Sequence, residues 1–174
     1  MTIKTLYLAR HAKSAWDTDA ASDFERPLSQ RGLRDARRIG GSLKQLGWQP
    51  QRIIASPAIR AKQTCHVYCE ALSVLPQSVI WNRDIYAAYL VSLLHMLSKQ
   101  PESIRSVMLI GHNPALEDVL VHLCGDALWR THSQKNGKLL TTGNVAKIVL
   151  DADWKDLVMC EARLVQLLRP KELS

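Results

Sequence analysis

The sequence predicts an α/β fold, a three-layer α/β/α arrangement in which helices cover both faces of a mixed, mostly parallel central sheet. Apolar stretches alternate with helical patterns in the order βαβαβαβα, and two further strands follow in succession near the C-terminus. The chain has 174 residues, so we expect a single domain spanning residues 1–174. Its 47% hydrophobic and 22% charged residues are usual for a globular protein.

The first predicted strand covers residues 3–10 and ends at Arg10 and His11. Ligands of open α/β sheets bind outside the carboxyl ends of the strands, so these two side chains should face a ligand. A neutral imidazole is a nucleophile near neutral pH, and a guanidinium binds phosphate oxygens through forked donors. This strand end therefore predicts a nucleophile beside an anion-binding group.

A polar stretch, residues 17–27, follows the strand. It contains four acids but lacks the glycine turn and terminal Glu of a calcium loop, so we expect a flexible rim beside the site. The next helix should cover residues 29–46, with Ser29 as its N-cap and Gly47 ending it.

The second strand, near residues 52–55, leads into Ser56-Pro57. Ser is favoured at a helix cap and Pro at the first helical position, so a helix should run to about residue 72. This start places Arg60 in the first helical turn, directed at the same sheet edge as His11. A short strand is expected near residues 79–81.

Another strand, residues 107–110, runs through Gly111 into His112, and helices are expected at residues 90–97 and 115–123. Parallel strands end at one sheet edge, so His112 should face His11. Residues 127–143 are predicted to form a mobile loop or turn. Two antiparallel strands should follow, at 145–150 and 161–168, with a bend at 151–153.

Three motifs in order resemble the signatures of the histidine phosphatase superfamily. They are Arg10-His11-Ala12, Ser56-Pro57 with Arg60 and Gln63-Thr64, and Gly111-His112-Asn113-Pro114. Three further stretches resemble the small SixA-type phosphohistidine phosphatase branch: Arg10-His11-Ala12-Lys13-Ser14-Ala15-Trp16, Arg26-Pro27-Leu28-Ser29-Gln30-Arg31-Gly32 and Arg169-Pro170-Lys171-Glu172-Leu173. The resemblance covers nearly the whole chain and implies a phosphoglycerate mutase-like fold.

With this resemblance, we expect His11 to form a phosphohistidine that water hydrolyses. Arg10, Arg60 and His112 should hold the phosphoryl oxygens, and His112 should donate best when its ring is protonated. Small phosphate esters remain an alternative substrate class, and a non-catalytic phospho-ligand binding module an alternative function.

The resemblance adds Arg26, Lys13 and Ser14 as substrate-binding residues. Position alone leaves two interpretations open for Arg26, the phosphate pocket or a rim salt bridge with Asp23 or Glu25. The candidate general acid is Asp84. It departs from the Glu-containing pattern of larger relatives, so an exposed turn carboxylate is an equal interpretation.

No cofactor and no metal are expected. The acids do not cluster at metal-binding spacing, so the cationic side chains should act in place of Mg²⁺. The four cysteines, Cys65, Cys69, Cys124 and Cys160, fit reduced buried thiols.

A site short of a clear acid suits phosphohistidine, whose imidazole leaves readily once protonated, so a phosphorylated protein is the expected partner. The net charge of +7 favours acidic partners, but the basic residues are dispersed and aromatics make up 6%, which disfavours nucleic acid. No apolar run reaches the roughly 18 residues of a membrane span, and the N-terminus does not resemble a signal segment, so we expect no membrane partner and a cytoplasmic protein.

Overall fold

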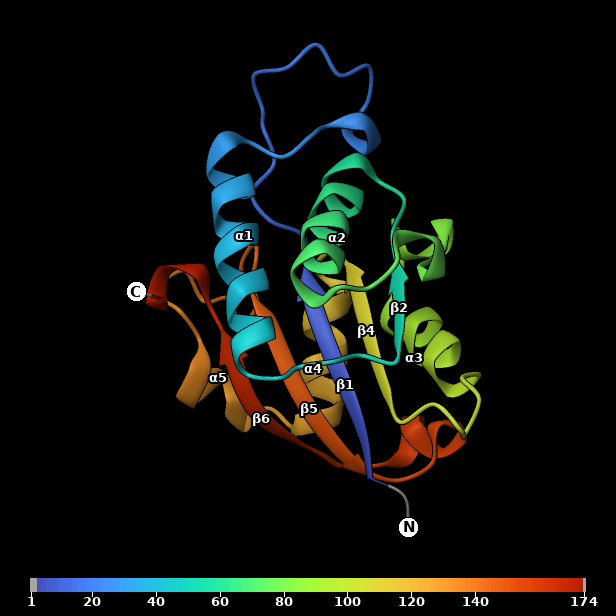
Figure 1. Cartoon of the computed structure of the whole chain (residues 1–174). Coiled ribbons are helices and arrows are strands. Elements are labelled where there is room, and N and C mark those ends of the chain that lie inside the picture. Colours follow the sequence, from blue (N-terminus) through green and yellow to red (C-terminus); the bar gives the residue numbers. More distant parts are fainter. Residues whose placement is uncertain (1–2, 174) are drawn as a thin grey trace.

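The computed structural model describes residues 3–173, built around one six-stranded sheet in the order β3-β2-β4-β1-β5-β6 (Figure 1). The strands are β1 (Ile3–Arg10), β2 (Arg52–Ala55), β3 (Ile80–Trp81), β4 (Ser106–Gly111), β5 (Val145–Asp151) and β6 (Ala162–Leu168). The α-helices are α1 (Gln30–Gln45), α2 (Ile59–Leu72), α3 (Leu90–Ser98), α4 (Ala115–Cys124) and α5 (Ala127–His132).

Strand β1 lies inside the sheet, parallel to β4 and antiparallel to β5. Strand β2 is parallel to both β4 and β3, whereas β5 and β6 are antiparallel. The predicted mixed, mostly parallel sheet is therefore confirmed. The carboxyl ends of β1, β2 and β4 meet at one edge, and the segment between β1 and α1 rises above that edge (Figure 1).

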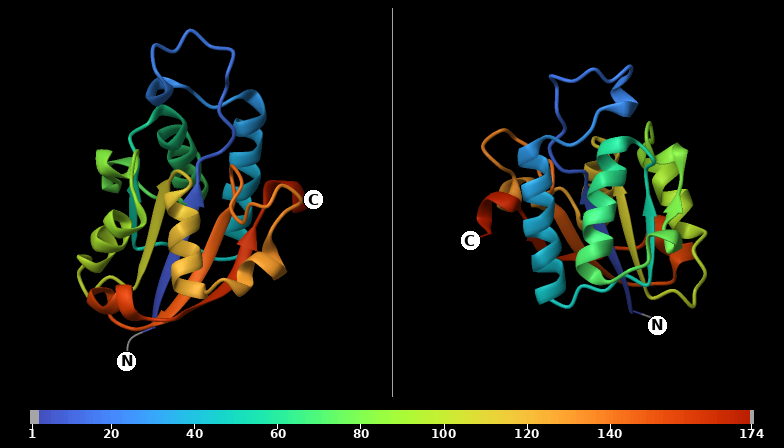
Figure 2. Two further views of the ribbon diagram at one scale, coloured as in Figure 1. Left: turned by 180° about the vertical axis from the view of Figure 1, so that it is seen from behind. Right: turned by 45° about the horizontal axis from the view of Figure 1, so that its top comes forward.

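Helices cover both faces of the sheet because alternate residues of the strands point to opposite sides. Leu6 and Leu8 of β1 pack in one apolar cluster with α3 and α4, while Tyr7 and Ala9 pack in a second cluster with α1 and α2. Figure 2 shows α4 on the side of the sheet opposite α1 and α2. The three-layer α/β/α arrangement follows from this alternation.

Helix α1 begins as predicted, since the Ser29 side chain accepts a hydrogen bond from the Gly32 N–H at 3.0 Å. Gly47 follows its end with a φ of 65°, the left-handed conformation expected of a residue that ends a helix. Both ends of α1 are thus fixed by local sequence.

Two connections differ from the prediction. The segment 127–143, expected to be a loop, contains α5, in which Leu128 is buried against the core. The link between β5 and β6 is more than a bend, because Trp154–Met159 form a 3₁₀ helix whose Trp154 and Leu157 are buried. Among residues 3–173, no helix combines the length and apolar character needed to cross a bilayer.

Candidate active site

His11 follows the last residue of β1, and its backbone N–H donates to the Gly111 carbonyl at 3.1 Å. The ring nitrogen Nδ1 lies 2.7 Å from the carbonyl oxygen of Ala12. A carbonyl only accepts hydrogen bonds, so Nδ1 carries the proton and Nε2 is unprotonated. That Nε2 accepts a hydrogen bond from Nε of Arg60 at 3.3 Å, which places the unprotonated imidazole nitrogen against a guanidinium.

His112 follows β4, and the centroids of its ring and the His11 ring are 5.0 Å apart. Its Nε2 lies 2.8 Å from the Ser56 hydroxyl, which donates when that nitrogen is unprotonated. Its Nδ1 is buried and has no hydrogen-bond partner within the described residues. The predicted meeting of the two histidines is therefore present.

Both imidazoles are neutral at pH 7. Burial, followed by the charge of Arg60, lowers the pKa of His112 to about 4. Burial is also the main cause that lowers the pKa of His11 to about 3. His112 therefore lacks the protonated form in which it was expected to donate best, but the neutral tautomer with hydrogen on Nδ1 still supplies a donor.

Arg60 lies in the first turn of α2, as predicted, and its side chain is buried. The predicted helix cap is wrong. The helix begins at Ile59, Ala58 occupies the N-cap position without a side-chain cap, and Ser56 contacts His112. The Ser56 hydroxyl also accepts from the Ala58 N–H at 3.3 Å. Tertiary contact with His112 therefore replaces the expected capping role.

Arg10 is anchored by its Nη1, which donates to the Leu140 carbonyl at 2.8 Å. The backbone of this segment is held in turn by Glu117, whose Oε2 accepts from the N–H groups of Leu139 at 2.9 Å and Leu140 at 2.8 Å. Glu117 thus positions Arg10 through two backbone groups. The sequence analysis missed it because these contacts join α4 to a segment more than twenty residues away.

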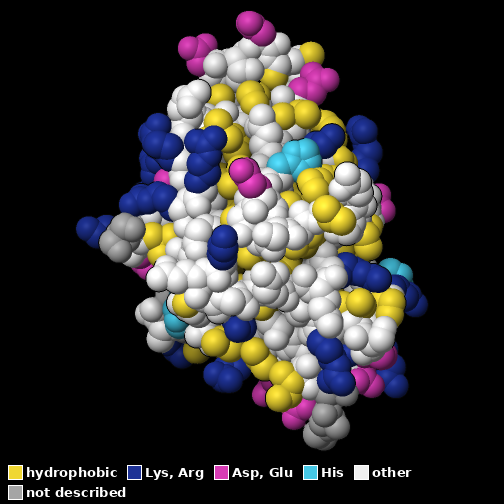
Figure 3. Space-filling model, viewed as in Figure 1, with side chains coloured by type: hydrophobic (Ala, Val, Ile, Leu, Met, Phe, Trp, Pro, Cys, Tyr) yellow, Lys and Arg dark blue, Asp and Glu magenta, His cyan; other side chains and the backbone are white. Residues whose placement is uncertain are grey.

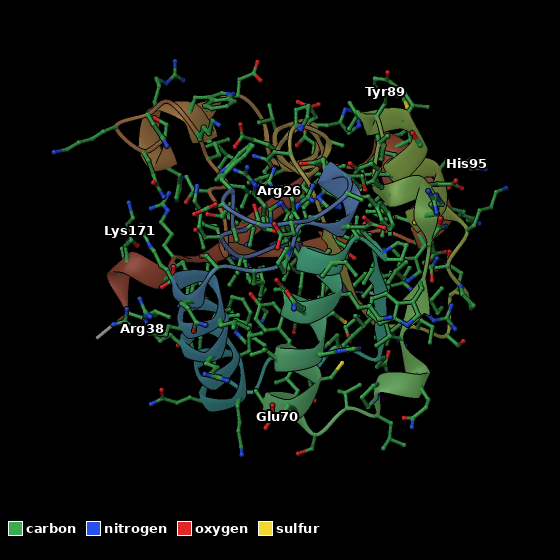
Figure 4. All side chains as sticks on the ribbon, turned by 90° about the horizontal axis from the view of Figure 1, so that it is seen from above. Arg26, Arg38, Glu70, Tyr89, His95 and Lys171 are labelled. Carbon is green, nitrogen blue, oxygen red and sulfur yellow. The ribbon has the colours of Figure 1, made fainter. Side chains whose placement is uncertain are left out.

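Arg26 forms the rim salt bridge that was one of its two interpretations, and its role in a phosphate pocket stays a prediction. Its Nη1 forms a salt bridge with Asp23 at 2.7 Å, and its Nη2 donates to the hydroxyl of Ser14. The guanidinium also lies 3.6 Å from the centre of the Trp16 ring. In Figure 4, which looks down from above, Arg26 lies over the middle of the molecule, between Lys171 on one side and Tyr89 on the other.

Asp23 contacts the site residue Arg60, although only a flexible rim beside the site was predicted for its loop. Its carboxylate reaches Nη2 of Arg60 at 2.9 Å and accepts a hydrogen bond from the Tyr86 hydroxyl at 2.8 Å. Tyr86 in turn packs edge-on against His112, with ring centroids 5.4 Å apart. The loop therefore contributes an acid to the site rather than only bordering it.

The side chains of Lys13 and Asp84 make no hydrogen bond or ion pair with either histidine among the described residues. The exposed Lys13 lines a groove of about 640 Å³ on the α1 side, together with Arg31, Asp35 and Lys171. Figure 3 shows Lys and Arg side chains gathered on this side of the molecule. Asp84 is exposed in a 3₁₀ turn, and its carboxylate makes no hydrogen bond or ion pair in the described part of the chain.

A smaller pocket of about 220 Å³ adjoins His112 and is lined by residues that include Tyr86, Tyr89 and Pro114. Between residues 3 and 173, no group of three or more His, Cys, Asp or Glu side chains is arranged to hold a metal ion. The four cysteines are free, and Cys65 and Cys69 are buried as predicted, whereas Cys124 and Cys160 are only partly buried. The site thus combines two neutral imidazoles with guanidinium groups, a donor set suited to a tetrahedral anion.

Comparison with known proteins identifies this arrangement. A family model for the histidine phosphatase superfamily (branch 1) matches residues 6–82. The phosphohistidine phosphatase SixA of Escherichia coli (strain K12) is 28% identical over 153 residues, which cover 84% of this chain and 85% of that protein. An uncharacterized chloroplastic protein of Arabidopsis thaliana is 30% identical over 133 residues, and the match spans 61% of its length.

Solved structures support the same relationship. The crystal structure of a SixA protein from Agrobacterium tumefaciens matches with a TM-score of 0.79 and 29% identity, covering 96% of this chain and 98% of that one. A phosphoglycerate mutase from Plasmodium falciparum matches with a TM-score of 0.64 at 16% identity, covering 95% of this chain and 91% of that one, which confirms the predicted phosphoglycerate mutase-like fold. The chain therefore belongs to the histidine phosphatase superfamily and is similar to its SixA phosphohistidine phosphatases.

Proposed function

We propose that this protein is a metal-independent phosphohistidine phosphatase that transfers the phosphoryl group of a phosphorylated protein to His11 and then to water. The observation that carries the proposal is the tautomer of His11. Its Nδ1 proton is held by the Ala12 carbonyl at 2.7 Å, so the lone pair is on Nε2, which accepts a hydrogen bond from Nε of Arg60 at 3.3 Å. A nucleophile and an anion-binding group are therefore adjacent before substrate arrives.

In the first step, Nε2 of His11 attacks phosphorus, and the bond between phosphorus and the substrate imidazole breaks. Arg10, Arg60 and the Nδ1–H of His112 hold the phosphoryl oxygens, where negative charge spreads in the transition state. In the second step, water attacks phosphorus, the bond to His11 breaks, and inorganic phosphate leaves. The neutral state of His11, with its pKa lowered to about 3, keeps the nucleophile available throughout the neutral range.

The leaving group supports phosphohistidine over an ester. An alkoxide requires a proton donor, whereas an imidazole leaves once its other nitrogen is protonated, and solvent can supply that proton. Asp84, the candidate donor, is exposed in its turn. The pocket of about 220 Å³ beside His112 has the size and aromatic lining to take an imidazole ring.

A protein substrate is supported by the surface around the site. The groove that begins at Lys13 has five Lys or Arg side chains in its lining and two acids, which favours an acidic protein surface. Arg26, with Ser14 as its partner, would complete the substrate-binding set at the rim.

Labelling tests the proposal directly. Incubation with a ³²P-phosphohistidine protein should give an acid-labile, alkali-stable label on the enzyme, and His11→Asn should abolish it. Turnover of a phosphohistidine protein should exceed that of a sugar phosphate at equal concentration. A clear preference for the sugar phosphate would assign the protein to the phosphomonoesterases, and binding without any label would assign it to phospho-ligand binding modules.

A further inference from the structure

Asp23 occupies the anion-binding face of the site. One carboxylate oxygen lies 2.7 Å from Nη1 of Arg26, and the other lies 2.9 Å from Nη2 of Arg60 and 2.8 Å from the Tyr86 hydroxyl. Its backbone carbonyl also accepts from Nη1 of Arg60. A single residue from the loop between β1 and α1 therefore binds two arginines that approach the site from different elements.

These contacts use the donors that a phosphoryl group would need. All three guanidinium nitrogens of Arg60 have partners, with Nε beside His11 and both Nη atoms on Asp23. A phosphoryl group on Nε2 of His11 would approach the same guanidinium. Two anions sharing one guanidinium repel one another, so the phosphoryl group and the carboxylate compete for the site.

The carboxylate is both charged and easily displaced. The hydrogen bond from Tyr86, followed by the charge of Arg60, lowers the pKa of Asp23, so it is an anion at neutral pH. Its side chain is 51% exposed, and no residue of the 3₁₀ turn Asp23–Glu25 is buried. Turning the loop outward would break polar contacts that water can replace, together with the edge contact between Phe24 and Tyr86, but it would uncover no buried residue of the turn.

We propose that Asp23 is an internal competitor for the phosphoryl group, which holds Arg26 and Arg60 in the free enzyme and is displaced by substrate. The inference rests on the proposed function, because it takes the phosphoryl site to be at Arg60. Inorganic phosphate has little beyond the arginine contacts to offset the competition, whereas a phosphorylated protein adds contacts outside the site. The cost of displacing Asp23 is the same for both ligands, so inorganic phosphate, which makes fewer contacts, is left with the weaker binding.

Calorimetric titration of the whole protein with inorganic phosphate tests the competition. Asp23→Asn keeps the shape but removes the charge, and it should bind phosphate about tenfold more tightly, which corresponds to about 1.4 kcal/mol. Glu25→Gln is the matched control. It removes the same charge from the same turn, and its exposed side chain makes no hydrogen bond or ion pair in the described region, so its phosphate affinity should stay within about twofold of wild type.

Tyr86→Phe provides an independent measurement if Asp23→Asn unfolds. It removes one of the contacts that hold the carboxylate and should raise phosphate affinity about two- to threefold. The inference would be overturned if Asp23→Asn bound phosphate no more tightly than wild type. If Asp23→Asn unfolds, the same result for Tyr86→Phe would overturn it. An equal gain in Glu25→Gln would overturn it as well, because the effect would then come from general charge.

Arg60→Ala separates this inference from the proposed function. It should remove most phosphate binding from wild type and from Asp23→Asn alike, because both depend on the same guanidinium. Unchanged binding in Arg60→Ala would place phosphate elsewhere and contradict the proposed site itself. Loss of binding in Arg60→Ala without any gain in Asp23→Asn would leave the site in place and refute only the competition.

Discussion

Replacement of Glu117 by Ala should destabilise the protein through two backbone groups. Oε2 of Glu117 accepts from the N–H groups of Leu139 and Leu140, two residues whose exposed fraction is 0%. Each buried N–H left without a partner costs about 1–3 kcal/mol. Glu117 is itself only half-buried, so water replaces part of the loss, and we expect the free energy of unfolding to fall by about 3 kcal/mol. For a chain of this length, that corresponds to a decrease in Tm of about 6–12 °C.

The same change should reduce activity, because the Leu140 carbonyl receives Nη1 of Arg10 at 2.8 Å. Release of this segment frees the guanidinium, and we expect kcat/KM for a phosphohistidine protein to fall about tenfold. Urea denaturation gives the stability and steady-state kinetics give the activity. Glu117→Gln keeps one oxygen able to accept both N–H groups, so it should lose less than half as much of either quantity.

Asp118→Ala is the control for this prediction. It removes an exposed acid from the same first turn of α4, so it reproduces the loss of a favourable helix-dipole interaction, about 0.3–1 kcal/mol, without touching the 139–140 segment. A Glu117→Ala variant no less stable than Asp118→Ala would refute the reasoning about orphaned N–H groups. If the stability of Glu117→Ala falls by the predicted amount but its kcat/KM is unchanged, the link to Arg10 is refuted.

Three further predictions follow from the geometry. In Gly32→Ala, the new Cβ would lie 2.0 Å from the Lys13 carbonyl oxygen, so the free energy of unfolding should fall by about 3 kcal/mol or more. Gly41→Ala is the control, because open space surrounds its Cβ, and it should be neutral or stabilising by up to about 1 kcal/mol. Equal stabilities of the two variants in urea denaturation would contradict this prediction. The pKa values of His11 and His112 are lowered to about 3 and about 4 in the folded protein. As pH falls from about 6.5 towards 4, these two histidines therefore bind more protons in the unfolded chain than in the folded one. The free energy of unfolding should decrease by up to about 1.4 kcal/mol per pH unit for each histidine. Urea denaturation at several pH values measures this slope, which should be shallower in His112→Asn; an unchanged slope would show that other groups cause it. Finally, kcat should be unaffected by excess chelator, and loss of activity that added metal restores would remove the proposed mechanism.

The placement of the main site residues was predictable because each depends on a local rule. Arg10, His11 and His112 follow apolar strands, and parallel strands bring their carboxyl ends to one edge. The placement of Arg60 depended only on where α2 begins. The predicted start was two residues too early, but Arg60 still lies in the first turn of the helix. Strand ends and helix starts therefore determined most of the site.

The remaining residues depend on contacts between distant segments. Asp23 meets Arg60 across 37 residues of sequence, and no local pattern distinguishes it from the other acids of its loop. Ser56 carried a true capping signal, but the ring of His112, 56 residues away, became its partner instead. Lys13 shares a motif with His11, yet it lines the groove on the α1 side. Motif membership did not fix the direction of its side chain.

The backbone around His11 is hydrogen-bonded to neighbouring segments on both sides. The N–H of Arg10 donates to the Asn144 carbonyl at 3.0 Å, the N–H of His11 donates to Gly111, and the N–H of Gly143 donates to the carbonyl of His11 at 3.0 Å. Amide hydrogens in such a position exchange with solvent only when neighbouring strands separate, whereas those of an exposed 3₁₀ turn exchange during brief local opening. The backbone at His11 is thus held in the sheet, whereas the Asp23–Glu25 turn has no buried residue. Under the proposed function, opening of this turn would admit phosphoproteins of different shape without shifting Nε2 of His11.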